Sequence, residues 1–465
     1  MTRLDRDSYS RTSLIDLLGG LTPQEVDARV AGYIIQVDVG AAVLTSRTRQ
    51  ATLLTAINCA KRAAPGGVRV RLAADGNCLV AWGRGELLSA LVELYGGTLV
   101  EALSDDKPTI VVGDAPTPAG SIVIYATWNG WAGGVVDDPS ARLPEKIEME
   151  LAGVLAGAIG VSESLQHLHG YVLAGRRPAG ASIWRPDLDW RAPMAAGKPL
   201  RFLPRALWLA GLGHLGQAYA WALGMLPYAD PHEMKVMLQD YDRVIEANKS
   251  TGLLTMIADR GKRKTRVVAS RLEELGFDTF ITERPFDTST TPDVAFAEPT
   301  TILAGFDDVR PRRQLEDGGF SYIVDAGLGT GEVHYLDMLL HTFPGITRAV
   351  DAFPERVRSD SVLPENFEDE VRRRVEAGED PLQAKCGVML LYGTAAAAAF
   401  VGATTAAFVI GDVLRAIHGG PRFDVVGFSL RTLLLSTAEA TQPTTPGVIP
   451  TVPVEPDAVQ DAEAA

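Results

Sequence analysis

Strand-like apolar runs alternate with helix-like stretches of mixed apolar and polar positions over residues 201–345. Two helices are expected, over Leu215–Leu226 and Lys262–Leu275. The strand-like runs around them read RALWLA, KVMLQ, FDTFITE, TTILAG and SYIVDAG. Strands that alternate with helices are typical of a parallel sheet covered on both faces. The pattern therefore predicts a doubly wound, Rossmann-like α/β domain.

A weaker version of the same pattern occupies the first 200 residues. Its strand-like runs are YIIQVDV, VRVRLA, CLVAW, TIVVGD and SIVIYATW, and helices are expected over Arg47–Ala64 and Gly85–Tyr95. The segment GAIGVSESLQHLHG at 157–170 also resembles AAFVIGDVLRAIHG at 406–419. Such internal similarity favours a duplication into two related α/β lobes, of which the first is degenerate and only the second retains a nucleotide site.

Composition divides the chain further, into lobes at 1–200 and 201–436. Residues 346–386 are rich in charge and form a predicted crossover segment within the second lobe. Gly387–Gly411 carries no charge and is long enough to cross a bilayer, but Ala, Gly and Thr dominate it, which predicts a tightly packed, buried helix instead. Residues 437–465 are rich in Pro, Thr, Ala and acids and are expected to be disordered.

The bulk numbers describe a soluble protein. Of 465 residues, 46% are hydrophobic and 22% charged, and the net charge of 44 − 58 = −14 argues against a nucleic-acid partner. The N-terminus lacks the apolar core of a secretory signal, so a cytoplasmic location without a membrane partner is expected. Cys59 falls in a predicted helix and Cys78 in a predicted strand, which indicates structural roles. The sequence has no Cys-x-x-C pair, so a structural zinc site is not expected.

A glycine turn joins the first strand of the second lobe to its helix. Gly211, Gly213 and Gly216 would let the backbone approach phosphates at the helix N-terminus. Asp240 ends the next strand, where an acid binds ribose hydroxyls, and Asp242 is its neighbour. These features fit an NAD- or FAD-dependent oxidoreductase as well as an ATP-binding protein, and a tight turn without a ligand is the third reading.

Later motifs distinguish these alternatives. In chain order they are Asp240-Tyr-Asp242-Arg-Val244 with Asn248, Gly261-Lys-Arg-Lys264, and Gly305-Phe-Asp307-Asp308 with Arg312. This series resembles the ThiF/MoeB and ubiquitin-activating enzyme superfamily, whose members adenylate a protein C-terminus. The resemblance implies ATP and Mg²⁺ as cofactors and a ThiF-type adenylation domain.

The resemblance also implies a role for each of four side chains. Asp240 would hold the ribose, Lys264 would contact the phosphates, and Asn248 would support the phosphate environment. Asp307 would ligate or orient Mg²⁺ and so take part in catalysis. A cation and a metal-bound carboxylate are what stabilisation of a developing charge on phosphorus requires.

The chain departs from the family pattern at one position. The family places an arginine three residues after the asparagine, and here Thr251 stands there. Lys249 is close in sequence but lacks the planar fork of a guanidinium. A catalytically weak, ThiF-like binding scaffold is therefore a further alternative.

Two more catalytic residues follow from the resemblance. The family's partner lobe supplies an arginine from an N-terminal helix, and Arg11 is expected to be this crossing arginine. Cys386 lies where the family often carries the thiol that accepts the activated carboxylate, and the adjacent Lys385 would favour its thiolate.

Together these interpretations predict a bacterial ubiquitin-like protein activating enzyme. It would adenylate the C-terminal carboxylate of a small ubiquitin-like or sulfur-carrier protein and then form a thioester on Cys386. A conjugating enzyme is the expected type of acceptor. Either the two lobes pair within one chain as a pseudo-dimer, or two chains form a homodimer.

Overall fold

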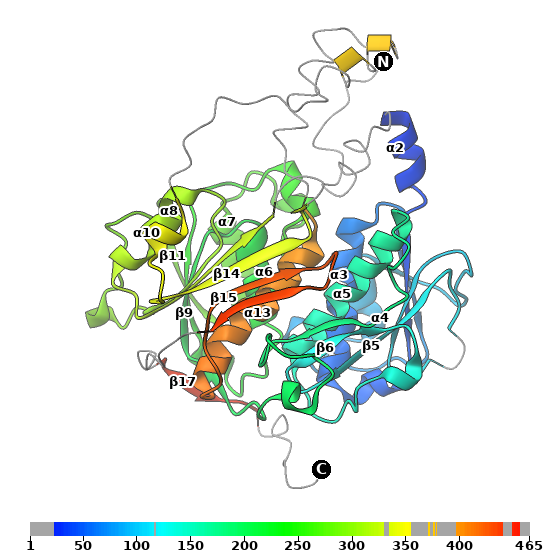
Figure 1. The fold of residues 1–465 in the computed structure, drawn as a ribbon, viewed down its shortest axis with the longest axis horizontal. Helices are drawn as coiled ribbons and strands as arrows, with labels where there is room; N and C mark the ends of the chain where they lie inside the picture. The colour runs from blue at the N-terminus through cyan, green and yellow to red at the C-terminus, as the bar shows by residue number, and fades with distance from the viewer. Residues whose placement is uncertain are drawn as a thin grey trace.

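Two lobes lie side by side, with long helices running between them (Figure 1). In the second lobe, α13 (Ala399–Ile417) and the strands at one edge of the sheet lie on the side of the first lobe's helices. The computed structural model describes residues 23–115, 118–329, 334–354, 371–372, 375–376, 378, 397–439 and 449–455.

The first lobe contains a seven-stranded sheet in the order β3-β2-β1-β4-β5-β6-β7. Strands β1 to β5 are parallel, and β6 and β7 are antiparallel to their neighbours. The strands are β1 Ile34–Val39, β2 Gly67–Leu72, β3 Gly97–Leu99, β4 Thr109–Val112, β5 Val123–Asn129, β6 Ala132–Val136 and β7 Ala179–Ser182. The helices are α2 Pro23–Val30, α3 Arg47–Ala63, α4 Leu88–Leu94 and α5 Glu150–Leu168.

The second lobe contains an eight-stranded sheet in the order β11-β10-β9-β12-β13-β14-β15-β16. Its strands are β9 Ala206–Ala210, β10 Lys235–Gln239, β11 Asp278–Thr282, β12 Thr301–Ala304, β13 Tyr322–Leu328, β14 Asp337–Phe343, β15 Phe423–Ser429 and β16 Leu435–Glu439. Besides α13, its helices are α6 His214–Leu223, α7 Lys264–Glu274, α8 Val309–Arg313 and α10 Ala349–Ala352. Short 3-10 helices in both lobes are η2 Ala41–Thr45, η3 Ala81–Gly83, η4 Pro139–Ala141, η5 Pro193–Ala196, η6 Pro231–Glu233, η7 Glu246–Ser250, η8 Ile257–Asp259, η9 Val294–Phe296 and η10 Leu315–Gly318.

The two sheets repeat one strand order, because the first seven strands of the second lobe follow the same path as β1 to β7. In both, five parallel strands are followed by antiparallel ones. The central strands β4, β10 and β12 are almost wholly buried, as their apolar runs required, whereas the edge strands β3 and β11 are partly exposed. The prediction of a doubly wound α/β fold is confirmed.

Two 19-residue helices, α5 and α13, occupy equivalent places in this order. Helix α5 connects β6 to β7, and α13 connects β14 to β15, so the similar segments 157–170 and 406–419 fall in matching helices. The helices pack against each other at the centre of the molecule (Figure 1). The lobes therefore meet through a layer of mostly small, buried side chains.

Helix α13 is the apolar segment that imitated a membrane span. By length and composition it passes as a candidate span, but 89% of its most apolar window is buried inside the protein. The predicted buried helix is thus confirmed, and it starts at Ala399, while residues 387–396 lie outside the described residues.

One predicted strand is wrong. The run CLVAW at 78–82 forms isolated bridges and the 3-10 helix η3 rather than a strand of the sheet. Its apolar character serves the contact between the lobes, because the Trp82 indole stacks on Trp221 at 5.1 Å and donates a 2.8 Å hydrogen bond to the Trp221 carbonyl. A short apolar run does not show whether its residues are buried in a strand of a sheet or in a contact between two lobes.

The expectation of disorder after residue 436 is wrong in two places. Strand β16 extends to Glu439, and β17 (Thr451–Pro453) pairs with β8 (Phe202–Pro204) in a separate two-stranded sheet. Pro453 is tolerated because it lies on an edge strand. Glu455 then forms ion pairs with Arg47 and Arg84 of the first lobe, so the segment 449–455 ties the lobes together.

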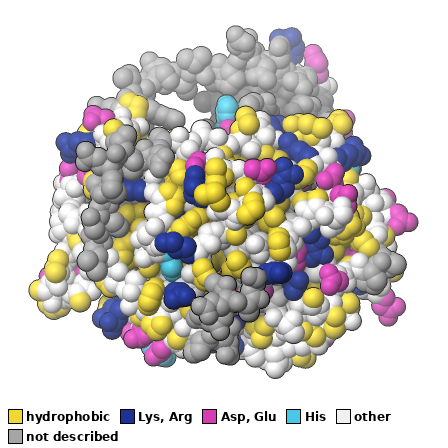
Figure 2. Space-filling view, turned by 60° about the horizontal axis from the view of Figure 1, so that its bottom comes forward, with side chains coloured by type: hydrophobic (Ala, Val, Ile, Leu, Met, Phe, Trp, Pro, Cys, Tyr) yellow, Lys and Arg dark blue, Asp and Glu magenta, His cyan; other side chains and the backbone are white. Residues whose placement is uncertain are grey.

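Figure 2 turns the lower edge of Figure 1, where β17 lies, toward the viewer. Basic, acidic and hydrophobic side chains are interspersed over the described part of this face rather than gathered by type.

Candidate nucleotide site

The candidate site lies where the carboxyl ends of β9, β10 and β12 meet. The Gly211 amide donates to the Gln239 carbonyl at 2.9 Å, and the Gly305 amide donates to the Ala210 carbonyl at 2.9 Å. Strand order reverses at β9, since β10 lies on one side of it and β12 on the other. Open α/β sheets form their ligand crevice at such a reversal.

Each glycine of the turn meets a different constraint. Gly211 has a positive φ of 82°, and a Cβ at Gly216 would collide with the Gly211 carbonyl oxygen. Gly213 precedes α6, and the nearest atom to a Cβ there would be the Lys264 ammonium nitrogen at 4.0 Å. Gly211 and Gly216 are therefore required by the shape of the turn, whereas Gly213 leaves open space between the turn and the Lys264 ammonium.

Asp240 braces this turn. One carboxylate oxygen accepts the Leu212 amide at 2.6 Å and the other accepts the Asp242 amide at 2.7 Å. The side chain is only 9% exposed. A carboxylate oxygen has a second lone pair, so these bonds leave capacity for a hydroxyl ligand.

Lys264 begins α7 and is joined to Asp242 by two contacts. Its ammonium nitrogen lies 2.7 Å from Asp242 Oδ2, and its amide donates to the Asp242 carbonyl at 3.0 Å. The lysine side chain is 12% exposed and the aspartate 51%. The structure thus brings together the glycine turn, the acidic pair and Lys264, as the sequence predicted.

The Asn248 region is used differently from the expectation. Asn248 Oδ1 accepts the Ile245 amide at 2.9 Å, so the side chain stabilises its own 3-10 helix. The Lys249 ammonium is 2.5 Å from Glu246 Oε1, and Thr251 is buried. Position 251 therefore presents no cation at the surface, and the charge of Lys249 is already paired.

Asp307 follows β12 and is exposed. Its neighbour Asp308 caps α8 by accepting the Arg310 amide at 2.9 Å and also pairs with the Arg310 side chain. Within the described residues, no hydrogen bond or ion pair engages the Asp307 carboxylate, and no group of three potential metal ligands is present. If the glycine turn binds phosphates, Asp307 is the carboxylate that could hold Mg²⁺, which takes few protein ligands and completes its shell with phosphate and water.

Arg312 pairs with a carboxylate that the sequence analysis did not single out. Its guanidinium contacts Asp325 of β13, with Nε 3.1 Å from Oδ1, and lies 4.2 Å from the ring centre of Phe353. Asp325 is fully buried, and burial raises its pKa although Arg312 opposes the shift. This pair fixes α8, and hence the Asp307 turn, on the sheet; the one charged residue inside the apolar run SYIVDAG was the available signal.

The first lobe offers a direct comparison, because Val39 pairs with Leu72 and Val112 as Ala210 pairs with Gln239 and Ala304. The residues that follow these strands therefore correspond. In this register the counterparts of Gly211, Asp240 and Gly305 are Gly40, Ala73 and Gly113.

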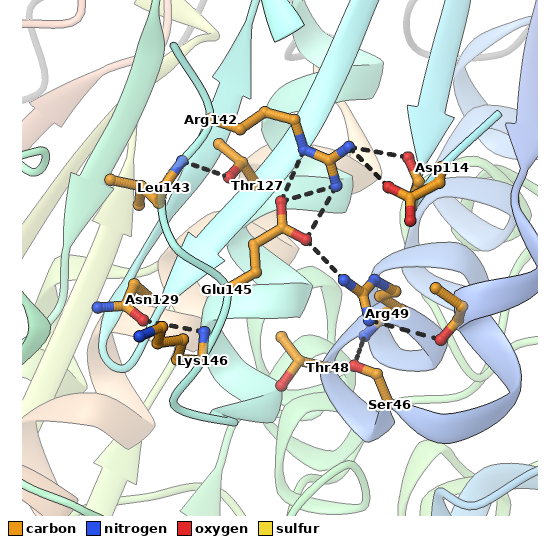
Figure 3. Close-up of polar contacts among 12 residues, drawn as sticks. Ser46, Thr48, Arg49, Asp114, Thr127, Asn129, Arg142, Leu143, Glu145 and Lys146 are labelled. Carbon is orange, nitrogen blue, oxygen red and sulfur yellow. Dashed lines mark hydrogen bonds and ion pairs between the residues drawn. The ribbon is translucent and has the colours of Figure 1, made fainter. Parts of the chain in front are cut away.

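Side chains fill the first lobe's strand ends (Figure 3). Arg142 donates to the Gly113 carbonyl at 3.0 Å and to Glu145 at 2.8 Å, and Arg49 reaches Glu145 at 2.9 Å. Asp114 adds a carboxylate 3.4 Å from Arg142. The first lobe thus has an ion-pair network at Gly113, the counterpart of Gly305.

Arg11 and Cys386 lie outside the described residues, and their predicted roles stay predictions. Cys59 and Cys78 are buried, and burial raises their pKa values to about 12 and about 11. Both thiols are therefore protonated and unreactive near neutral pH, in agreement with structural roles.

A duplicated, doubly wound fold with a glycine turn, acidic pair, lysine and free carboxylate at one switch point defines the ThiF/ubiquitin-activating, or E1-like, class. Two family models match the chain: the BilD N-terminal domain over residues 34–183 and the BilD C-terminal domain over 203–420. The bacterial E1-like protein BilD of Collimonas sp. (strain OK412) is 36% identical over 401 residues, which are 85% of each chain. The chain belongs to the BilD family of bacterial E1-like proteins.

Solved structures of E. coli MccB are also similar. The structure with succinimide shares 13% identity with a TM-score of 0.32, and the similarity covers 52% of this chain and 64% of that chain. The structure with MccA-N7isoASN gives 14% identity at the same TM-score. The chain thus spans slightly less than two thirds of MccB, and a likeness this remote supports no further conclusion.

Proposed function

We propose that this protein uses Mg-ATP to adenylate the C-terminal carboxylate of a small ubiquitin-like or sulfur-carrier protein. The observation that carries the proposal is the Lys264 ammonium facing the open side of Gly213, in a chain of an E1-like family. In this reaction a carboxylate oxygen bonds to the α-phosphorus of ATP. The bond to the bridging oxygen breaks, and pyrophosphate leaves with its electron pair.

The site residues have separate roles in this proposal. The glycine turn lets main-chain amides approach the phosphates, and Asp240 accepts the ribose hydroxyls with its remaining lone pairs. Lys264 offsets negative charge that develops on the phosphates. Asp307 is the protein ligand for Mg²⁺, which would supply charge stabilisation at the α-phosphate.

The surroundings of the site favour an anionic ligand. Basic side chains gather on the segment that leads from the acidic pair to α7, and several are partly paired with acids. Within the described residues all but Arg243 are ion-paired with acids that offset their charge, so the preference for a triphosphate over a nicotinamide dinucleotide rests on Lys264 beside Gly213. This basic group consists of Arg243, Arg260, Lys262, Arg263, Lys264 and Arg266.

In the same proposal the first lobe binds no nucleotide. Ala73 replaces the ribose-binding acid, and the network of Arg142, Glu145 and Arg49 fills the space at Gly113. The lobe would instead complete the active lobe within one chain, as a pseudo-dimer in the cytoplasm.

The later steps of the proposal involve residues outside the described part of the chain. The Cys386 thiolate would attack the acyl carbon of the adenylate, forming a thioester as AMP leaves, and a conjugating enzyme would then accept the acyl group. Arg11 would reach the phosphates from the partner lobe. An ATP-dependent adduct with the carrier protein that is reversed by thiols, and is lost in Cys386→Ala, is the expected sign of the thioester.

Calorimetric titration with Mg-ATP tests the nucleotide site. Lys264→Ala should weaken binding about tenfold or more, because a charge-assisted contact to phosphate is lost. Lys262→Ala is the matched control, since this lysine pairs with Asp259 at 2.8 Å and is more than half exposed. Equal affinity in wild type and Lys264→Ala, or saturable binding of NAD⁺ in place of ATP, would contradict the proposal.

A catalytically weak scaffold is the second candidate. The paired Lys249 and the buried Thr251 favour it, because they leave the Asn248 region without a free cation. This candidate predicts binding of the carrier protein without any ATP-dependent adduct. Formation of the thiol-reversible adduct would exclude it.

A further inference from the structure

Arg62 belongs to α3 of the first lobe, and three of its hydrogen bonds go to main-chain carbonyls of the second lobe. Its Nε donates to the Gly252 carbonyl at 3.0 Å, and Nη2 donates to the Leu253 and Thr255 carbonyls at 3.2 and 3.1 Å. Nη1 donates to the Asn58 carbonyl at 3.1 Å. Three convergent carbonyls of one segment are thus held by a single guanidinium from the opposite lobe.

Burial leaves the Arg62 guanidinium with a small set of protein partners. Arg62 is 8% exposed, and within the described residues its donors go only to main-chain carbonyls and to the Asn58 carboxamide. Asn58 itself donates to the Leu253 carbonyl at 3.1 Å. No carboxylate among these partners neutralises the guanidinium, so the Arg62 side chain keeps its positive charge next to the main chain of segment 252–255.

The segment held by Arg62 is connected to the nucleotide site by two short routes. The Gly252 amide donates to the Asn248 carbonyl at 2.8 Å, which leads to η7. Gln217 of α6 accepts the Leu254 amide at 3.1 Å through Oε1 and donates to the Leu212 carbonyl at 3.3 Å. The second route ends at the glycine turn.

We infer that Arg62 is a positioning residue for the nucleotide site of the opposite lobe. It holds segment 252–255, and through it the glycine turn and η7, in the arrangement that binds ATP. This inference rests on the proposed function for the identity of the ligand. Lysine cannot replace Arg62, because an ammonium lacks the planar fork that reaches three carbonyls at once.

The test compares Arg62→Lys with Arg71→Lys. Arg71 pairs with buried Asp38 inside the first lobe, 2.7 Å apart, so its substitution perturbs a contact within that lobe. Mg-ATP affinity is measured by calorimetry, and amide hydrogen exchange of 246–255 is measured without nucleotide. Asn58→Ala, which removes one contact to Leu253, serves as a milder variant if Arg62→Lys folds poorly.

Arg62→Lys should weaken Mg-ATP binding about tenfold and speed exchange in 246–255, whereas Arg71→Lys should leave both unchanged even at an equal loss of thermal stability. Wild-type affinity and exchange in Arg62→Lys would overturn the inference. If wild-type protein binds no Mg-ATP, the proposed function fails by itself. The exchange measurement then still decides the role of Arg62: faster exchange supports it, and unchanged exchange refutes it.

Discussion

Three carboxylates near the second lobe's strand ends have different roles because of what each contacts. Asp240 accepts two main-chain amides, and Asp325 pairs with Arg312. Asp307 is exposed and, within the described residues, has no protein partner. Residue type is the same in all three, so the contacts alone leave Asp307 as the candidate for a metal.

Glu150, at the start of α5, gives a prediction at the residue scale. Burial raises its pKa to about 8, with Glu148 and Glu455 raising it further and Arg47 opposing the shift. A carboxyl whose pKa is raised by folding stabilises the protein fully below its unfolded pKa of about 4.5, and this contribution is lost as pH rises through about 8. The urea midpoint should therefore fall between pH 6 and 9, and fall less in Glu150→Gln.

Exposed Glu274 offers the control for this experiment. Glu274→Gln removes the same kind of charge at an exposed position, so its pH profile is the baseline for that of Glu150→Gln. Identical pH profiles for wild type and Glu150→Gln would mean that other groups cause the change.

Sequence reasoning placed the glycine turn, the acidic pair and Lys264 in one site, whose nucleotide-binding role stays a prediction, but it did not give their contacts. Gly211, Asp240, Asp242 and Lys264 come together because consecutive strands place their carboxyl ends at one edge. The capping role of Asn248 depends on local geometry that spacing does not determine. Arg62 was out of reach of sequence reasoning, because its partners lie about 190 residues away in the other lobe.

At the scale of elements, the closeness of α3 and α5 depends on glycine. A Cβ at Gly157 would lie 2.5 Å from the Thr52 carbonyl oxygen, whereas one at Gly160 would meet only the Ile110 side chain, at 3.2 Å. A backbone atom cannot move away as a side chain can. The two glycines are thus a matched pair within one helix.

Gly157→Ala should lower the free energy of unfolding by about 1–3 kcal/mol, as overpacking does. Gly160→Ala should be nearly neutral, because a gain of about 1 kcal/mol in helix propensity offsets a small side-chain shift. Urea denaturation of both variants checks this. Equal losses in the two variants would show that the close approach at Thr52 is not the cause.

Element prediction succeeded where apolar runs were long and failed where burial had another cause. The central parallel strands were recognised because they are buried on both faces, whereas the three-residue edge strand β3 was not predicted. The run at 78–82 was misassigned because contact between lobes made it apolar. The 449–455 strap was missed because its Pro-rich composition is that of disordered tails.

At the scale of the whole molecule, this strap is expected to contribute to stability. Ile449, Val452 and Val454 are buried, and Glu455 pairs with Arg84. Burial of three such side chains is worth several kcal/mol, so a chain ending at residue 448 should lose about 5 °C or more in thermal midpoint. A chain ending at 455 keeps the strap and should match wild type; equal midpoints in both truncations would contradict the prediction.

The ion-pair network at the first lobe's strand ends has a consequence for how this protein can evolve. A symmetric dimer of one gene carries every substitution twice, so a change that helps one site must be tolerated by the other. Here Arg142, Glu145 and Arg49 occupy the strand ends of the first lobe. A mutation in that lobe therefore affects the candidate site of the second lobe only through the contacts between the lobes. Under the proposed function each chain would hold one nucleotide, and half of the gene would be free to specialise in support.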